Sequence, residues 1–221
     1  MAGERPRICA AITGTDIEAI NRIEPDVDLW EVRIDLIGKG WQKVATQLKK
    51  PWIACNRRVE EGGKGSRRDS QRIKELLSAI ELGASIIDVE LGTTGLPDIV
   101  KEIKGKAKCL ISYHNLKETP PLDRLRQIVV NQLAAEADIC KVVTTARLFN
   151  DNFSVLQVIK DFPQNKVVAF AMGTAGQISR VLCPLVGGYF TYTSLAEGKE
   201  SAEGQITVTE LRKIYVMLWN E

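Results

Sequence analysis

Short apolar runs alternate with amphipathic stretches along the whole chain. The runs are rich in β-branched and aromatic residues, and several are apolar almost without interruption, as expected for strands buried on both faces of a parallel sheet. The pattern predicts strands at residues 7–12, 29–35, 51–58, 85–91, 108–114, 138–144, 166–172 and 189–194.

Between these runs, apolar residues recur with the period of a helix. Residues 70–83 place four apolar side chains on one stripe and end at Gly83, a residue suited to a helix C-terminus. Residues 121–137 and 207–219 have the same character. Eight strand–helix units predict an α/β fold, a single (β/α)8 TIM barrel that forms one catalytic domain over residues 1–221. A doubly wound open sheet is the alternative, but no GxGxxG motif follows the first predicted strand.

Composition narrows the class of protein further. Among 221 residues, 30 Lys and Arg and 28 Asp and Glu give a net charge of +2, which is too small to predict nucleic-acid binding. We find neither an apolar run of membrane-spanning length nor the apolar core of a signal peptide, so we expect no membrane partner. The five cysteines lack CxxC spacing and most lie in apolar runs, which predicts buried, reduced thiols in a cytoplasmic protein.

Polar residues interrupt the predicted strands near their C-terminal ends, where TIM barrels carry their active sites. They are Glu31, Arg33 and Asp35 in the second run, Arg57, Arg58, Glu60 and Glu61 around the end of the third, Asp88 and Glu90 in the fourth, His114 in the fifth and Lys141 in the sixth, followed by Met172 and Arg180. Buried charges are costly unless they are paired, so these residues together predict a polar pocket rich in arginine.

Each of these positions also has a purely structural interpretation. The alternating charges of the second strand are compatible with an outward ladder of salt bridges, and Lys141 with a side chain that extends from a strand end to solvent. His114, the only histidine, is compatible with a turn cap or a core hydrogen bond, and Met172 with core packing. A single histidine argues against a zinc or iron site.

Eight short segments, taken in order, carry a resemblance to a known family. They are EVRID, NRRVEEGG, DVEL, SYHN, KVV, AMG, ISR and SAEGQIT. Together they resemble type I 3-dehydroquinate dehydratase, the Schiff-base-forming enzyme of the shikimate pathway. The resemblance implies a hydro-lyase that converts 3-dehydroquinate to 3-dehydroshikimate, the third step of that pathway to chorismate and the aromatic amino acids. It also implies a homodimer of (β/α)8 barrels that uses no cofactor and no metal.

The resemblance assigns roles to individual residues. Lys141 matches the imine-forming lysine, His114 the general acid and base, and Glu61 the carboxylate that orients this histidine. The substrate-binding positions that it implies are Glu31, Arg33, Arg57, Met172, Arg180, Ser201 and Gln205. Arg180 matches the arginine that binds the substrate carboxylate, while Ser201 and Gln205 match residues of a lid.

Two features of the chain depart from the family pattern. The residue after the histidine is often acidic in the family and is Asn115 here. The chain also begins almost directly at the first predicted strand, whereas longer members carry extra N-terminal strands that close the bottom of the barrel. How this barrel is closed is therefore an open question at this point.

The chemistry explains why such residue types would be used. Loss of a proton next to a ketone and of a β-hydroxyl proceeds more readily from a protonated imine, which requires a neutral amine. Burial and neighbouring cations lower the pKa of a lysine, and we expect them to bring that of Lys141 to about 7–8. One imidazole, His114, can take and return protons near neutral pH. The polar loop over residues 195–205 is expected to be mobile without a ligand and ordered with one.

Two rival functions are open. Another imine-forming barrel lyase of the aldolase type would also use a lysine of the sixth strand, but it would usually need a phosphate site after the last two strands. A barrel retained only as a binding module would be expected to have lost the lysine or the histidine, and both are present.

Overall fold

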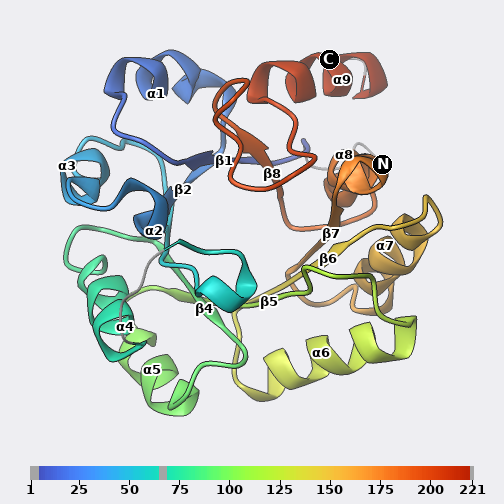
Figure 1. Cartoon of the computed structure of the whole chain (residues 1–221), viewed down its shortest axis with the longest axis horizontal. Coiled ribbons are helices and arrows are strands. Elements are labelled where there is room, and N and C mark those ends of the chain that lie inside the picture. The colour runs from blue at the N-terminus through green and yellow to red at the C-terminus, as the bar shows by residue number, and fades with distance from the viewer. Residues whose placement is uncertain (1–4, 65–68, 220–221) are drawn as a thin grey trace.

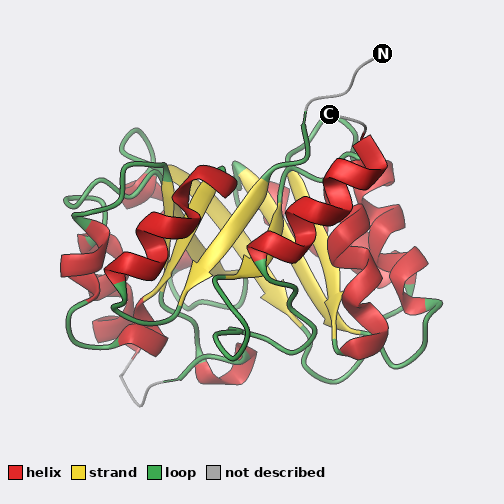
Figure 2. Ribbon diagram, turned by 90° about the horizontal axis from the view of Figure 1, so that it is seen from above, coloured by secondary structure: helices red, strands yellow, loops and turns green. Residues whose placement is uncertain are grey.

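Eight parallel strands curve into a nearly closed barrel that helices surround (Figures 1 and 2). The computed structural model describes residues 5–64 and 69–219. The strands are β1 (Ile8–Ile12), β2 (Leu29–Arg33), β3 (Trp52–Cys55), β4 (Ile86–Glu90), β5 (Lys108–His114), β6 (Ile139–Thr145), β7 (Val167–Met172) and β8 (Thr191–Ser194). The predicted (β/α)8 barrel is confirmed.

The helices that follow the strands form the outer layer (Figure 2). They are α1 (Ile17–Ile23), α2 (Ile34–Ile37), α3 (Trp41–Ala45), α4 (Asp69–Ser78), α5 (Leu96–Ile103), α6 (Leu122–Ala134), α7 (Asp151–Asp161), α8 (Gln177–Leu185) and α9 (Val208–Trp219), with short 3-10 turns η1 (Glu24–Asp26), η2 (Val59–Glu61) and η3 (Thr174–Gly176). Within the described parts of the chain, no helix is long and apolar enough to cross a bilayer.

The helices bury one apolar face each against the barrel. In α6, Leu125, Ile128 and Val129 are buried against neighbouring helices and strands. Burial of each such side chain contributes about 1.5–3 kcal/mol of transfer free energy. The fourth buried position of α6 is polar, and its amide has a defined task, because Gln132 Nε2 donates to the backbone carbonyl of Lys141 at 2.8 Å. Helix packing thus fixes the strand that carries this lysine.

Alternate side chains of the strands fill the barrel interior. The interior cluster comprises Cys9, Leu29, Ile53, Ile86, Leu110, Ile139, Val143, Val168, Phe170, Phe190 and Tyr192. Tyr189, just before β8, packs against this cluster and carries two cations over its ring, the guanidinium of Arg7 at 4.6 Å and the amine of Lys166 at 5.2 Å. These contacts cover the end of the barrel at which the strands begin.

The sheet order runs from β7 through β1 to β8, so β7 and β8 are its two edges. The backbone N–H of Tyr189 donates to the carbonyl of Val167 at 2.8 Å and joins the start of these edges. Between the other strands the register is continuous, and in β5 and β6 it places Ser112 opposite Lys141 and His114 opposite Val143. Strands five and six are therefore neighbours, as the predicted (β/α)8 barrel requires.

Two predicted strands end earlier than expected. The second ends at Arg33 rather than at Asp35, because the backbone turns into the short helix α2, and Asp35 belongs to that helix. The prediction that three alternate charges share one strand is therefore wrong for Asp35. The third strand ends at Cys55, so Arg57 and Arg58 lie in the turn that follows it.

Candidate active site

A cavity of about 280 Å³ lies at the C-terminal ends of the strands. The ten residues to which the family resemblance assigns roles all line it, namely Glu31, Arg33, Arg57, Glu61, His114, Lys141, Met172, Arg180, Ser201 and Gln205. The other polar residues predicted for the pocket are not among its lining residues, namely Asp35, Arg58, Glu60, Asp88 and Glu90. The barrel brings them together because parallel strands deliver their C-terminal ends to the same rim.

Lys141 projects from β6 into the floor of the cavity. Its amine lies 3.0 Å from Oδ2 of Asp88 and 3.2 Å from Oε1 of Glu31, and all three side chains are buried. Burial lowers the pKa of Lys141, but the carboxylates of Asp88 and Glu31 outweigh burial and raise that pKa above its ordinary value. The sequence-based expectation of a lowered pKa for Lys141 is therefore wrong, because two carboxylates reach the amine.

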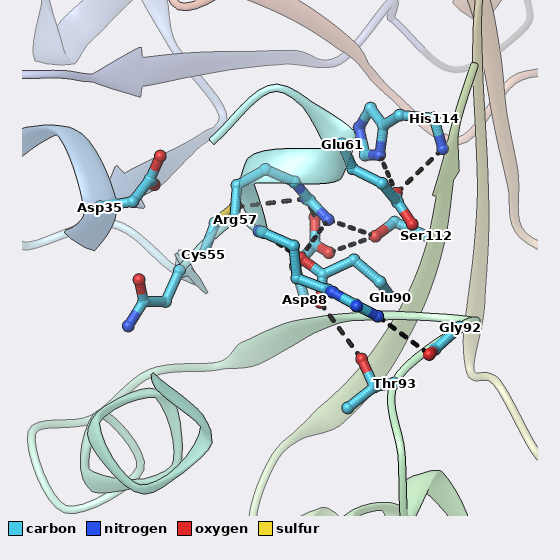
Figure 3. Close-up of polar contacts among 12 residues, drawn as sticks. Asp35, Cys55, Arg57, Glu61, Asp88, Glu90, Gly92, Thr93, Ser112 and His114 are labelled. Carbon is cyan, nitrogen blue, oxygen red and sulfur yellow. Dashed lines mark hydrogen bonds and ion pairs between the residues drawn. The ribbon is translucent and has the colours of Figure 1, made fainter. Parts of the chain in front are cut away.

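His114 ends β5 and contacts Glu61 twice (Figure 3). Its ring Nδ1 lies 2.8 Å from Oε2 of Glu61, and its backbone N–H donates to the same oxygen at 3.0 Å. Burial, helped by the charges of Arg57 and Lys141, holds the pKa of His114 well below its usual value. Burial also raises the pKa of Glu61 to about 7. A neutral imidazole, oriented by a carboxyl group that itself titrates near neutrality, therefore lines the cavity.

Arg57 organises the carboxylates beneath the cavity (Figure 3). Its guanidinium donates to Asp88 at 2.5 Å, to Glu90 at 3.0 Å and to the hydroxyl of Ser112 at 2.6 Å, with a further contact to Cys55 Sγ at 3.2 Å. Ser112 in turn donates to Asp88 at 2.6 Å. Because a buried charge is stable only when it is paired, this network fixes Arg57 and the carboxylate of Asp88 in single positions.

Arg33 is held by two parallel hydrogen bonds to Asp35, from Nε at 2.9 Å and from Nη2 at 2.7 Å. This fork geometry sets the orientation of the guanidinium at the wall of the cavity. Asp35 also accepts the backbone N–H of Lys64 at 3.1 Å, which ties the loop after η2 to the same carboxylate.

Arg180 is a buried cation on α8 that has no carboxylate partner among the described residues. Its Nε has no hydrogen-bond partner there, and Nη2 donates to the backbone carbonyl of Glu203 at 3.3 Å. Burial lowers its pKa to about 10, so the guanidinium remains charged at neutral pH. An unpaired buried guanidinium that lines a cavity favours an anionic ligand, and a carboxylate would satisfy it with two hydrogen bonds.

The loop over residues 195–205 contributes Ser201, Ala202, Glu203 and Gln205 to the cavity wall. Oε1 of Gln205 accepts both the backbone N–H and the hydroxyl of Ser201, at 2.7 and 3.2 Å. The carbonyl of Glu203 accepts the N–H of Gly173 at 3.3 Å.

At Gly204 the loop approaches the end of β7 very closely. A Cβ there would lie 2.5 Å from the carbonyl oxygen of Gly173, so glycine is required. Its φ of +75° is a second reason for glycine. The loop therefore lies against the rim by backbone contact.

The similarity of the chain to known proteins identifies its family. A family model described as Type I 3-dehydroquinase matches residues 8–220. The chain belongs to the type I 3-dehydroquinase family. Its activity is therefore that of a hydro-lyase of the shikimate pathway, which removes water from 3-dehydroquinate, and the family decides against the aldolase alternative.

Individual relatives of the type I 3-dehydroquinase family agree along nearly their whole length. The 3-dehydroquinate dehydratase of Dehalococcoides mccartyi is 41% identical over 213 residues, which are 96% of each chain. That of Methanopyrus kandleri is 34% identical over 96% of this chain and 99% of its own. The crystal structure of 3-dehydroquinate dehydratase from Geobacillus kaustophilus superposes with a TM-score of 0.87 at 23% identity, covering 99% of this chain and 93% of that one.

Three clustered side chains of this type I 3-dehydroquinase have the donor types of a metal site. Ligand atoms of Glu31, Cys55 and Asp88 lie within 4.8 Å of one another. Two cationic side chains already pair with this cluster. Lys141 contacts both carboxylates, and Arg57 contacts Asp88 and the thiol. The group is therefore the anionic counterpart of the lysine and the arginine.

Several residues that shape the cavity were not predicted from the sequence. Asp88 was noted as polar, but its contact with Lys141 was not anticipated. Phe170 and Tyr192 also line the cavity, although both read as ordinary interior residues of strands. Phe190, just before β8, and Tyr192 within it occupy alternate positions, which was the one signal that Tyr192 faces inward.

Proposed function

We propose that this chain dehydrates 3-dehydroquinate through an imine between the amine of Lys141 and the substrate ketone. The observation that carries the proposal is the placement of Lys141, His114 and Arg180 around one cavity. A substrate whose carboxylate is bound by Arg180 can place its ketone next to the amine of Lys141 and its reacting carbon next to the imidazole of His114. Such fixed placement is the main contribution that a protein makes to a reaction of this kind.

The surrounding polar groups would hold the hydroxyls of the substrate. Arg33 is pre-oriented by Asp35, and Ser201 and Gln205 reach the cavity from the loop that covers it. Glu31 shares the amine of Lys141 with Asp88. Met172 supplies an apolar wall at the end of β7. These groups position the ring, while the chemistry falls to Lys141 and His114.

The proton of Lys141 must leave before its amine can attack. His114 is neutral because burial lowers its pKa, so its Nε2 can accept that proton as the substrate binds. The amine nitrogen then forms a bond to the ketone carbon, and the proton on the imidazole is returned to the oxygen. The imidazole then carries a second proton from the nitrogen to the resulting hydroxyl, which departs as water and leaves the nitrogen as a positively charged imine.

The same imidazole would carry the elimination. Its Nε2 takes the proton from the carbon next to the imine, and the electron pair moves into the charged nitrogen. The electron pair then moves back from the nitrogen, and the β-hydroxyl leaves as a second water with the proton from His114. Hydrolysis of the imine restores the amine of Lys141. One general acid and base typically supplies a rate factor of roughly 10²–10⁴, and Glu61 keeps this one in orientation.

Borohydride reduction during turnover tests the imine. We expect loss of activity together with a covalent adduct on the peptide that contains Lys141, because reduction converts the imine into a stable amine. Lys166→Met, which replaces an exposed lysine, should retain both the inactivation and the adduct. Full activity after reduction, or an adduct on another lysine, would contradict the mechanism.

We also propose that the chain is one domain that acts as a cytoplasmic homodimer. Its five free cysteines are all buried, which suits a reducing compartment. The rings of Phe149 and Phe153 pack edge to face with their centroids 5.9 Å apart. They are nevertheless 60% and 61% exposed, as expected of a surface that a partner covers. Light scattering on the purified chain should give twice the monomer mass, and Phe153→Lys should lower the measured mass. A monomeric wild-type chain would refute the dimer.

A further inference from the structure

Two aromatic rings form the floor of the cavity. Phe170 on β7 and Tyr192 on β8 contact each other with ring centroids 5.8 Å apart, and both rings are buried. Both also line the cavity. Phe190 lies beyond Tyr192, at 5.4 Å between centroids, and is not among the cavity-lining residues. The floor therefore consists of two rings that face the cavity, and a third ring, Phe190, packs against Tyr192.

Each of the two rings carries one of the functional cations. The amine of Lys141 lies 4.0 Å from the ring centroid of Tyr192, and the guanidinium carbon of Arg180 lies 4.4 Å from that of Phe170. The face of an aromatic ring attracts a cation at these distances, and the attraction is stronger where water is excluded. The spacing between the two cations is thus set by two rings in mutual contact.

The hydroxyl of Tyr192 is buried and has no hydrogen-bond partner among the described residues. Its removal therefore breaks no described contact, while the ring and its contact with the amine of Lys141 remain. This separates the contribution of the ring from that of the hydroxyl and makes Tyr192→Phe a matched control.

We propose that Tyr192 and Phe170 are positioning residues, which hold the imine nitrogen and the carboxylate-binding guanidinium at the spacing that one substrate ring requires. The inference rests on the proposed roles of Lys141 and Arg180. The nitrogen of Lys141 is positively charged as an ammonium and again as a protonated imine, so Tyr192 stabilises it in both of these states. Phe170 keeps the guanidinium of Arg180, which has no carboxylate partner in the described chain, against the cavity wall.

The two rings should separate in their kinetic effects. Tyr192→Leu should lower kcat by roughly two- to thirtyfold, the range expected from loss of one partly desolvated cation–π contact, with KM near its wild-type value because Arg180 is untouched. Phe170→Leu should instead raise KM by a similar factor with a smaller change in kcat. Tyr192→Phe, which keeps the ring, should retain more of the wild-type kcat than Tyr192→Leu.

Phe190→Leu is the control for packing, because it removes an equally buried ring of the same cluster that contacts neither cation. Thermal unfolding and circular dichroism of every variant show whether it folds, and Tyr192→Met replaces Tyr192→Leu should the latter fail to fold. Equal losses of kcat in Tyr192→Leu and Phe190→Leu, or a wild-type kcat in Tyr192→Leu, would overturn the inference.

Borohydride trapping on the wild-type protein distinguishes this inference from the proposal beneath it. An adduct on Lys141 combined with unaltered kinetics of Tyr192→Leu and Phe170→Leu overturns only the positioning role of the rings. Absence of the adduct overturns the imine mechanism itself. An adduct together with the separate kcat and KM effects supports both.

Discussion

The amine of Lys141 and the carboxylate of Asp88 lie 3.0 Å apart in the floor of the cavity. Burial would raise the pKa of Asp88, but Arg57 and Lys141 together hold it well below its usual range. Asp88 is therefore ionised at neutral pH, and its charge favours the protonated form of the amine. Substrate binding must release that proton before the amine can attack.

Asp88→Asn should shift imine formation to lower pH. Asparagine keeps the shape of the side chain but removes the charge that raises the pKa of Lys141, so the neutral amine appears earlier in a titration. Single-turnover trapping with borohydride at a series of pH values measures the shift. Asp98→Asn, an exposed change on α5, is the control, and an unchanged profile in Asp88→Asn would show that Asp88 does not govern the amine.

Activity should rise with pH through about 7, the pKa to which burial raises Glu61. An ionised Glu61 accepts a hydrogen bond from Nδ1–H of His114 and leaves Nε2 free as a base, whereas a protonated Glu61 donates a hydrogen bond to Nδ1 and leaves the imidazole proton on Nε2. The acidic limb of the kcat/KM profile therefore belongs to the pair.

Glu61→Gln should abolish this limb and lower the plateau by roughly 10²-fold, since the imidazole loses its orienting charge. Glu60→Gln, at an exposed neighbouring carboxylate, should leave the profile as it is. Persistence of the limb at the same pH in Glu61→Gln would assign it to another group.

Lys141→Met should destabilise the fold as well as abolish turnover. Among described residues, the amine of Lys141 is the hydrogen-bonding partner of the buried Glu31 carboxylate, and methionine would leave that charge unpaired. Removal of one member of a buried ion pair costs about 3–5 kcal/mol. Adding Glu31→Gln to Lys141→Met should restore much of the loss, as measured by denaturant unfolding. A single variant as stable as the wild-type protein would contradict this account.

The loop over residues 195–205 should exchange its amide hydrogens more slowly when product is bound. Product on Arg180 would meet Ser201 and Gln205 and hold the loop against the rim, which lowers the population of open states. Hydrogen exchange with and without product measures the change, and α5 serves as an internal reference. Gly204→Ala should remove the ligand-dependent protection, because its Cβ collides with Gly173. Equal protection in both states would show a rigid loop.

The sequence was sufficient to place most of the site because parallel strands gather their C-terminal ends on one rim. A lysine in β6 and a histidine at the end of β5 therefore lie at the same rim, whatever the sequence of the helix between the two strands. The sign of the pKa shift of Lys141 could not be predicted in this way. Periodicity gives the face of a strand, whereas the shift depends on which carboxylates come within about 4 Å of the amine.

The aromatic floor was beyond prediction for a similar reason. Phe170 and Tyr192 have the composition and spacing of core residues, and only the curvature of the closed sheet puts their faces under the side chains of β6 and α8. The early end of β2 was also not predicted, because Asp35 leaves the strand, turns back to hold Arg33, and accepts the backbone N–H of Lys64 from a loop distant in sequence.

The backbone contact between Gly204 and Gly173 divides the loop into two parts with different tolerance to change. The docking point is fixed at position 204, whereas the preceding stretch from Glu197 to Glu200 is exposed. One long side-chain hydrogen bond reaches that stretch, from Thr13 to the carbonyl of Lys199 at 3.4 Å. Doubling the length of such a segment costs only about 0.6 kcal/mol in closure entropy. A fluorescent reporter or a short peptide tag inserted there should follow the opening of the cavity without altering where the loop comes to rest.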